Sequence, residues 1–229
     1  MAVKKRSDIK KFNEHLTEEQ RQVKKDLYGL TVVTFNGKAG SGKTSLAVNY
    51  AYEQLSLKNI DKIIITRATV MRKQHDLGFL KGDADEKMLP WMRPIHDAIY
   101  KLEPKTATRD KVEELVEKRK LEIVPLAHVQ GRTFENAVIV VDEYQNLDNI
   151  DIQMILTRLG RGSKMIFCGD FRQSVIYNSG IATLNAACIK FDAMNNFTFT
   201  ENFRDPIVEK IIDFYEAEDE KRKKIKING

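Results

Sequence analysis

The sequence predicts a three-layer α/β domain with a mainly parallel central sheet, and three observations indicate this fold. Short apolar, β-branched runs alternate with longer amphipathic stretches, as strands and helices alternate in α/β proteins. The apolar runs lack the two-residue alternation of a half-exposed sheet, as expected for strands that are buried on both faces. A glycine-rich loop lies between the first of these runs and the amphipathic segment that follows it.

Six segments are expected to form the sheet, because each is short, apolar and rich in β-branched residues. The expected strands are residues 31–36, 62–66, 121–125, 137–141, 165–168 and 197–200.

Five amphipathic or charged segments are expected to form helices. They are residues 43–57, 87–102, 110–120, 150–159 and 206–217. The second carries Met88, Trp91, Ile95, Ile99 and Leu102 at helical spacing. The fourth follows Asp148 and Asn149, either of which can cap it, and is expected to end at Gly160, while Pro206 suits the first turn of the fifth.

Composition favours one soluble domain in a reducing compartment. The 229 residues are 42% hydrophobic and 31% charged, and no apolar run approaches the roughly 20 residues of a membrane span. Two isolated cysteines argue against a disulfide framework, and a cytoplasmic location is expected. The four histidines show no metal-ligand spacing. The expected organisation is a basic N-terminal arm at 1–16, one domain at 17–217 and a charged C-terminal tail at 218–229.

The net charge is mildly basic. Thirty-eight Lys and Arg against 33 Asp and Glu give 38 − 33 = +5. This balance permits a nucleic-acid partner without requiring one.

The glycine-rich loop, "GKAGSGKT" at Gly37–Thr44, fits the Walker A pattern G-x-x-x-x-G-K-[ST]. Gly37, Gly40 and Gly42 allow positive φ angles, so that successive N–H groups can cradle phosphates at the start of the next helix. Lys43 is expected to reach the β- and γ-phosphates, and Thr44 to supply a hydroxyl to Mg²⁺. The expected nucleotide-binding residues of the loop are Gly37, Lys38, Ala39, Gly40, Ser41, Gly42, Lys43, Thr44 and Ser45.

A second acidic motif, "AVIVVDEYQN", places two carboxylates at the end of an apolar strand, as in a Walker B motif. Asp142 is expected to hold Mg²⁺ through water, and Glu143 to activate the attacking water. Further along, Gln173 in "GDFRQ" is placed to sense the γ-phosphate or orient water. Arg204 lies just after the last expected strand, where it would neutralise charge on the γ-phosphate, although a surface salt bridge explains its position equally well.

ATP hydrolysis fits these motifs better than the other P-loop activities. The chain has no "NKxD" run of the kind GTPases use. A small-molecule kinase has little use for a free glutamate beside the Walker B aspartate.

Taken together, the chain resembles the PhoH family of ATPases over about residues 17–215. The resemblance rests on an ordered series of motifs: "GKAGSGKT", "KIIITRATV", "LGFLKGD", "PWMRPIHDAI", "VPLAHVQGRTFENAVIVVDEYQN", "LTRLGRGSKMIFCGD" and Ser179–Gly180. The family is similar to the N-terminal motor domain of superfamily 1 helicases. This likeness implies a RecA-like sheet with a further strand between the Walker A and Walker B strands.

The resemblance also implies roles for individual residues. "LTEEQ" is similar to the helicase Q motif, in which Gln20 would bind adenine. "TRATV" and "GRT" resemble segments that face nucleic acid, which implies contacts from Thr66, Arg67, Arg132 and Thr133, with Arg72 and Lys73 nearby. The sequence departs from the family pattern in having Ala68 where proline is usual, Lys81 in place of the proline of "GFLPG", and Tyr144 where alanine is usual.

The leading expectation is therefore an Mg²⁺-dependent ATPase that acts on RNA or single-stranded DNA, in a helicase-like way. The alternative is a regulatory module that binds ATP with little turnover. Helicases of this type place ATP between two motor domains, and only one is seen here. A homo-oligomer, most simply a hexameric ring, is expected to close the site with Arg204 from a neighbour, or with Arg158 or Arg161. A monomer that uses Arg204 in cis is the alternative.

Overall fold

The computed structural model describes residues 12–68, 97–100 and 108–227, and its centre is one six-stranded sheet. Every strand pair in it is parallel, in the order β3-β2-β4-β5-β1-β6. The strands are β1 (Val32–Gly37), β2 (Lys62–Arg67), β3 (Leu121–Ile123), β4 (Ala137–Asp142), β5 (Lys164–Gly169) and β6 (Met194–Phe199). All six predicted strands are present, although β3 ends at Ile123 rather than at residue 125 and β6 spans Met194–Phe199 rather than 197–200. Strand β5 lies between the Walker A and Walker B strands as expected.

The middle strands form because their residues suit burial on both faces. All six residues of β4 are buried, and β1 and β5 are buried along most of their length. Such strands contribute to the two cores through successive residues, which explains their near-continuous Val, Ile and Phe composition.

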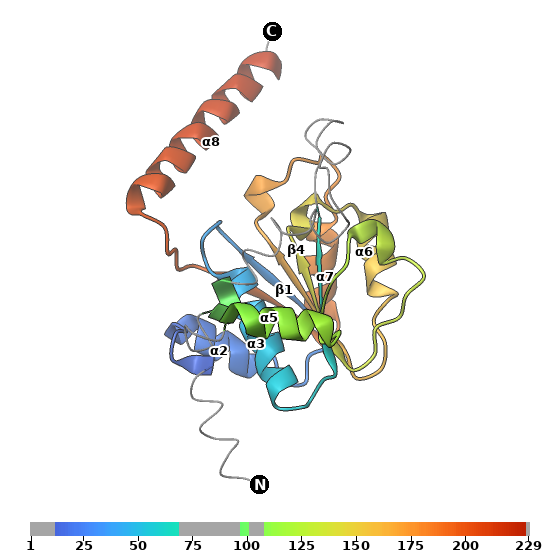
Figure 1. Ribbon diagram of the computed structural model, residues 1–229. Helices are drawn as coiled ribbons and strands as arrows, with labels where there is room; N and C mark the ends of the chain where they lie inside the picture. The colour runs from blue at the N-terminus through green and yellow to red at the C-terminus, as the bar shows by residue number, and fades with distance from the viewer. Residues whose placement is uncertain (1–11, 69–96, 101–107, 228–229) are drawn as a thin grey trace, which may run out of the picture.

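Helices cover both faces of the sheet and complete the three layers (Figure 1). On one face lie α2 (Glu18–Asp26), α3 (Lys43–Ser56) and α5 (Thr108–Glu117), which share an apolar core with the sheet. The other face is covered by α6 (Asn149–Leu156) and α7 (Ile181–Lys190), which contribute to a second core. The α/β class and the parallel sheet are therefore confirmed.

The strand register aligns the carboxyl ends of four strands along one edge. Arg67 at the end of β2 lies opposite Asp142 at the end of β4. Asp142 in turn lies opposite Cys168 in β5, and Gly169 lies opposite Asn36 in β1. Because the loops that leave these strands start side by side, residues far apart in sequence meet at this edge.

The short helix α2 is held against α3 and the chain after β6 by polar contacts near its two ends. Thr17 and Gln20 form a reciprocal capping box at its start. The buried Lys24 lies 2.6 Å from the Glu53 carboxylate of α3. The Glu19 carboxylate accepts hydrogen bonds from the backbone N–H and the hydroxyl of Thr200, 3.0 and 2.9 Å away. These contacts place α2 next to the chain that leaves β6.

The helices differ from the sequence prediction in their ends and number. The expected helix at 150–159 begins at Asn149, where the Asp148 side chain caps it, and ends at Leu156 rather than at Gly160. The helix at 206–217 is α8 (Pro206–Ile227), which runs on through residues expected to form a tail and projects away from the sheet (Figure 1). Helices α2 and α7 are not among the predicted helices.

Most of the expected helix at 87–102 lies outside the described residues, although residues 97–100 are helical. Within the described part of the chain, no helix is both long and apolar enough to span a membrane.

Candidate nucleotide-binding site

The glycine-rich loop has the backbone shape that the sequence predicts. Gly37, Gly40 and Gly42 have φ angles of 151°, 92° and 81°, and α3 starts at Lys43 directly after them. An L-residue adopts these angles only with strain, so glycine is required on conformational grounds. The first turn of α3 therefore directs its unpaired N–H groups into the loop, where an anion can bind.

Lys43 is held inside the loop by backbone acceptors. Its Nζ donates to the carbonyl oxygens of Gly37 and Lys38, both at 2.8 Å, and to Oγ of Ser41 at 3.1 Å. Burial lowers the pKa of Lys43, against the opposing effect of nearby acidic groups. These three neutral acceptors hold the cation where phosphate oxygens would meet it.

Thr44 and Asp142 join the Walker A and Walker B motifs directly. The Thr44 hydroxyl donates to Oδ1 of Asp142 across 2.8 Å. Burial raises the pKa of Asp142, although Arg67 and Thr44 oppose the shift. A hydroxyl and a carboxylate in contact are hard oxygen donors, which is the chemistry that Mg²⁺ prefers. The two residues therefore fit the metal site expected from the sequence.

Glu143 follows Asp142 in a conformation that is uncommon for a non-glycine residue. Its φ and ψ are 56° and 34°, in the left-handed region. Each carboxylate oxygen has a partner: Oε1 accepts from Nη2 of Arg67 at 3.0 Å, and Oε2 accepts from Nε2 of Gln145 at 2.6 Å. Backbone strain of this kind persists where surrounding contacts hold it and is frequent at functional sites.

Gln145 is a site residue that the sequence reasoning missed. Besides Glu143, its side chain contacts the backbone N–H of Asp170, which donates to Oε1 at 3.1 Å. The Asp170 carboxylate in turn accepts from the backbone N–H of Ala39 at 3.0 Å. Gln145 thus ties the Walker B segment to the glycine-rich loop through Asp170. The sequence signal that could have identified Gln145 is its amide side chain, two residues after the acidic pair Asp142–Glu143.

Most of these groups line one cavity of about 210 Å³ at the carboxyl edge of the sheet, although Gln145 and Arg67 are not among its lining residues. The sequence-predicted residues that line it come from the glycine-rich loop, the Walker B pair, Gln173 and Arg204. The loop contributes Ala39, Gly40, Gly42, Lys43, Thr44 and Ser45. Cys168, Gly169 and Asp170 also line it.

Gln20 and Arg204 lie against the loop, each close to one of its glycines. A Cβ at Gly40 would lie 2.7 Å from Cγ of Arg204, and a Cβ at Gly42 would lie 2.5 Å from Nε2 of Gln20. The backbone N–H of Phe203 also donates to the Gly40 carbonyl at 3.1 Å. Arg204 therefore approaches the loop of its own chain, as the cis alternative requires.

The four residues expected to face nucleic acid do not form one group. Thr66 is buried, and Arg67 contacts Glu143, which lines the cavity of about 210 Å³, without lining that cavity itself. Arg132 instead pairs with Glu122 of β3 at 2.5 Å and lies over the Phe134 ring, which Lys62 at the start of β2 also contacts. None of the four is among the described residues that line the cavity. Arg72 and Lys73 lie outside the described residues.

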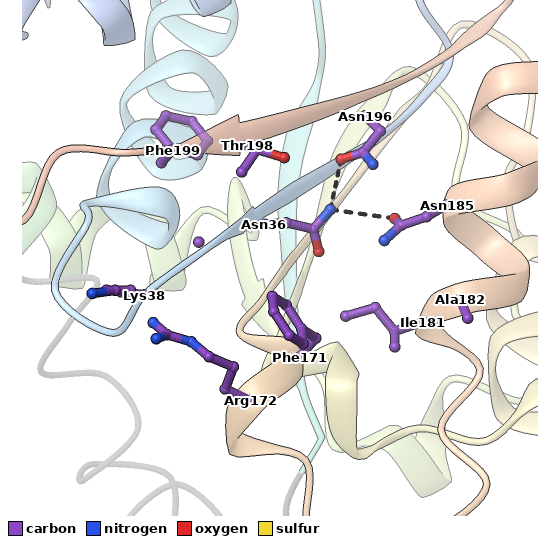
Figure 2. Close-up of a pocket in the computed structure, with 11 residues that line it drawn as sticks. Asn36, Lys38, Phe171, Arg172, Ile181, Ala182, Asn185, Asn196, Thr198 and Phe199 are labelled. Atoms are coloured by element: carbon purple, nitrogen blue, oxygen red, sulfur yellow. Dashed lines mark hydrogen bonds between the residues drawn. The ribbon is translucent and has the colours of Figure 1, made fainter. Parts of the chain in front are cut away.

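A second hollow, of about 580 Å³, lies on the α7 side of β1. Figure 2 shows Asn36 in its wall with its side chain turned toward Asn185 and Asn196, and Phe171 and Ile181 nearby. Nδ2 of Asn36 donates to Oδ1 of Asn196 at 2.7 Å and to Oδ1 of Asn185 at 3.3 Å. This amide cluster connects β1, β6 and α7.

Tyr144, where the family pattern has alanine, completes this cluster. Its fully buried ring packs edge-on against Phe167, and its hydroxyl donates to Oδ1 of Asn36 at 2.6 Å. The Tyr144 side chain thus links the Walker B segment to β1, the strand that precedes the glycine-rich loop.

We expect Tyr144→Phe to lower the free energy of unfolding by about 1–3 kcal/mol, because Asn36 Oδ1 loses a buried donor. Tyr28→Phe is the matched control, since Tyr28 is 64% exposed and should change stability little. Denaturant unfolding of the three proteins measures the difference. Equal stability of the two variants would show that the Tyr144 hydroxyl contributes nothing.

Comparisons with known proteins found relatives of similar sequence and structures of similar fold. A family model described as PhoH-like protein matches residues 14–216. A PhoH-like protein of Synechocystis sp. is 38% identical over 206 residues, which is 87% of this chain and 61% of that protein. A PhoH-like protein of Bacillus subtilis is 40% identical over 187 residues, covering 80% of this chain and 57% of that protein. The chain therefore spans about three fifths of the length of these curated relatives.

Among solved structures, the large terminase of a thermophilic bacteriophage matches with a TM-score of 0.51 and 10% sequence identity. The match covers 82% of this chain and 46% of the terminase. The Pif1 helicase of Candida albicans matches with a TM-score of 0.40 and 18% identity, over 86% of this chain and 42% of the helicase. The terminase supports the P-loop NTPase fold alone.

Proposed function

Because the chain belongs to the PhoH family, we propose that it is an Mg²⁺-dependent ATPase that couples hydrolysis to the binding or remodelling of RNA or single-stranded DNA. One observation carries the hydrolytic part of this proposal. Lys43, Thr44, Asp142, Glu143 and Gln173 line the same cavity of about 210 Å³. A phosphate-binding cation, two metal-binding oxygens, a second carboxylate that can act as a base and a polar amide are the groups that phosphoryl transfer to water needs.

In the proposed reaction, the loop N–H groups bind the phosphates of ATP and Lys43 exchanges its carbonyl partners for β- and γ-phosphate oxygens. Thr44 and Asp142 would hold Mg²⁺, which would supply positive charge that neutralises the phosphates when bound. Glu143 takes a proton from a water molecule that Gln173 orients. The water oxygen bonds to the γ-phosphorus as the bond to the β–γ bridging oxygen breaks, leaving ADP and phosphate.

Arg204 is proposed to stabilise the negative charge that develops on the γ-phosphate, and to do so within its own chain. Its side chain lies against Gly40 of the same molecule and lines the same cavity as Lys43. The hydrogen bond from the backbone N–H of Phe203 to the Gly40 carbonyl positions the backbone directly before Arg204. These contacts favour the cis arrangement over a shared site in which a neighbour supplies Arg204.

Mixing two inactive variants tests this assignment. Lys43→Ala and Arg204→Ala subunits, mixed after their oligomeric state is measured by light scattering, are expected to show no recovery of ATPase activity. In a cis arrangement every subunit of the mixture lacks one of the two groups. Recovery toward a fraction of wild-type activity would show that Arg204 acts across a subunit interface.

A homo-oligomer, with a hexameric ring favoured, remains part of the proposal. Helix α8 supports it, because Ile207, Ile211 and Phe214 are exposed at helical spacing on an element that projects from the sheet (Figure 1). Apolar side chains gathered in this way are typical of contact surfaces. Arg158 and Arg161 are the candidates for an arginine that reaches a neighbouring site.

The nucleic-acid part of the proposal rests on family membership, mild basicity and the partly exposed Arg67. We expect single-stranded RNA or DNA to bind, with a logarithm of the binding constant that falls linearly with the logarithm of salt concentration. We also expect the bound strand to raise the rate of phosphate release. Titration of labelled RNA and DNA at several salt concentrations, with ATPase assays alongside, measures both effects.

Failure to bind either polymer at low salt would contradict this part. ATP binding without turnover would instead favour the second candidate, a regulatory module that holds ATP.

A further inference from the structure

We propose that Arg67 is a latch on Glu143, and that a phosphate group of a nucleic-acid strand opens it by taking the Arg67 guanidinium. The Arg67–Glu143 ion pair would then hold the candidate base in a resting position until the polymer binds. This inference rests on the proposed function and deepens it, because it names the contact through which polymer binding would control hydrolysis.

The latch is built into the sheet register. Arg67 is the last residue of β2 and lies opposite Asp142, so its side chain reaches the next residue of the Walker B segment. Nη2 lies 3.0 Å from Oε1 of Glu143, and Nε lies 3.8 Å from Oδ2 of Asp142. The closer contact is to the candidate base rather than to the candidate metal ligand.

The pair holds Glu143 from one side while Gln145 holds it from the other. Gln145 Nε2 donates to Oε2 at 2.6 Å, so the carboxylate is fixed between two donors. A carboxylate fixed in this way must give up a charge-assisted contact before it can turn to a water molecule at the γ-phosphate. The left-handed backbone of Glu143 is consistent with a residue that its neighbours hold in a strained position.

The latch is accessible to a polymer. The side chains of Arg67 and Glu143 are each 32% exposed, so a phosphate group can reach the guanidinium from solvent. The planar guanidinium binds phosphate oxygens in the same two-point manner as it binds a carboxylate. A phosphate can therefore replace Glu143 as the partner of Arg67.

Arg132, expected to share the nucleic-acid role, lacks this connection. Its partner is Glu122 on the edge strand β3, which does not line the nucleotide cavity in the described part of the chain. A strand phosphate bound at Arg132 would only add affinity for the nucleic acid. A strand phosphate bound at Arg67 would also release Glu143 from its ion pair.

The first test measures binding and does not depend on ATP hydrolysis. Linkage requires that removing the carboxylate from the latch strengthens polymer binding, because Arg67 no longer has to leave Glu143. Glu143→Gln is therefore expected to bind a labelled single strand of RNA or DNA about five-fold tighter than wild type, or more, at the low end of usual coupling between sites. Arg67→Gln is expected to bind it more weakly than wild type. Unchanged or weaker binding by Glu143→Gln would overturn the latch.

The second test measures turnover without polymer. Arg67→Gln is expected to raise the basal kcat several-fold, with little change in the KM for ATP, and to lose further stimulation by the polymer. Arg67→Lys keeps the cation and is expected to restore part of the low basal rate. Lys62→Gln is the matched control, since Lys62 stands at the other end of β2 in an ion pair with Glu122 and should leave basal turnover unchanged.

A basal rate that falls or stays the same in Arg67→Gln would overturn the latch, and thermal melting identifies a variant that has failed to fold. If the wild-type chain shows no hydrolysis under any condition, the proposed function fails instead. The binding comparison between Glu143→Gln and wild type still decides on the latch in that case.

Discussion

Glu143→Gln is expected to lower kcat at least about 100-fold while ATP binding stays near the wild-type level, because the substitution removes the candidate base and keeps the shape of the side chain. Glutamine cannot take a proton from water at neutral pH. The loop, Lys43 and the Thr44–Asp142 pair remain in place to bind the nucleotide. Steady-state phosphate release and a direct ATP-binding measurement separate the two effects.

Glu122→Gln is the matched control for this prediction. Glu122 is also a partly buried glutamate paired with an arginine, but it stands on β3 with Arg132 and Lys62 as partners. Its substitution should leave kcat near wild type. If Glu143→Gln and Glu122→Gln turn over at the same rate as wild type, Glu143 is not the base and the hydrolytic assignment is wrong.

The parts of the site that the sequence predicts are those set by local spacing. Gly37, Gly40, Gly42, Lys43 and Thr44 lie within one loop, whose shape follows from the glycines and the start of the next helix. The Walker B pair, Asp142 and Glu143, comes at the end of a strand that is recognisable from its run of apolar residues. Parallel strands then place both segments at one edge of the sheet, so the contact between Thr44 and Asp142 could be expected without knowledge of the full register.

The contacts that depend on tertiary packing could not be predicted in this way. Sequence spacing places Arg67 at a strand end, but only the register of β2 on β4 shows that it meets Glu143. The same applies to Arg132, whose motif implied a shared duty and whose structure pairs it with Glu122. Family motifs describe which residues recur, whereas pairing depends on which strands are neighbours.

The two missed helices differ in what the sequence offered. Helix α2 follows Thr17 with Gln20 three residues later, which is a capping-box signal that was available. Helix α7 begins after Gly180, which makes no side-chain cap, and its sequence "IATLNAACIK" carries little charge. Its existence depends on packing Ile181 and Leu184 onto the sheet, which a local pattern does not reveal.

Lys43→Ala is expected to weaken ATP binding or transition-state stabilisation by about 3 kcal/mol, the scale of a lost charge-stabilising donor. That energy corresponds to a factor of roughly 100 in affinity or rate. Lys43 is buried and held by neutral loop acceptors, so its charge acts on phosphates with little screening by water. Lys38→Ala is the control in the same loop, because it keeps the backbone N–H that is expected to bind phosphate. It removes only a side chain whose Nζ lies 3.9 Å from Asp213 of α8, so its loss should matter far less. Calorimetric titration with ATP, together with melting temperatures, separates loss of binding from loss of folding. A folded Lys43→Ala variant that binds and hydrolyses ATP at wild-type strength would contradict the assignment of the loop as the phosphate site.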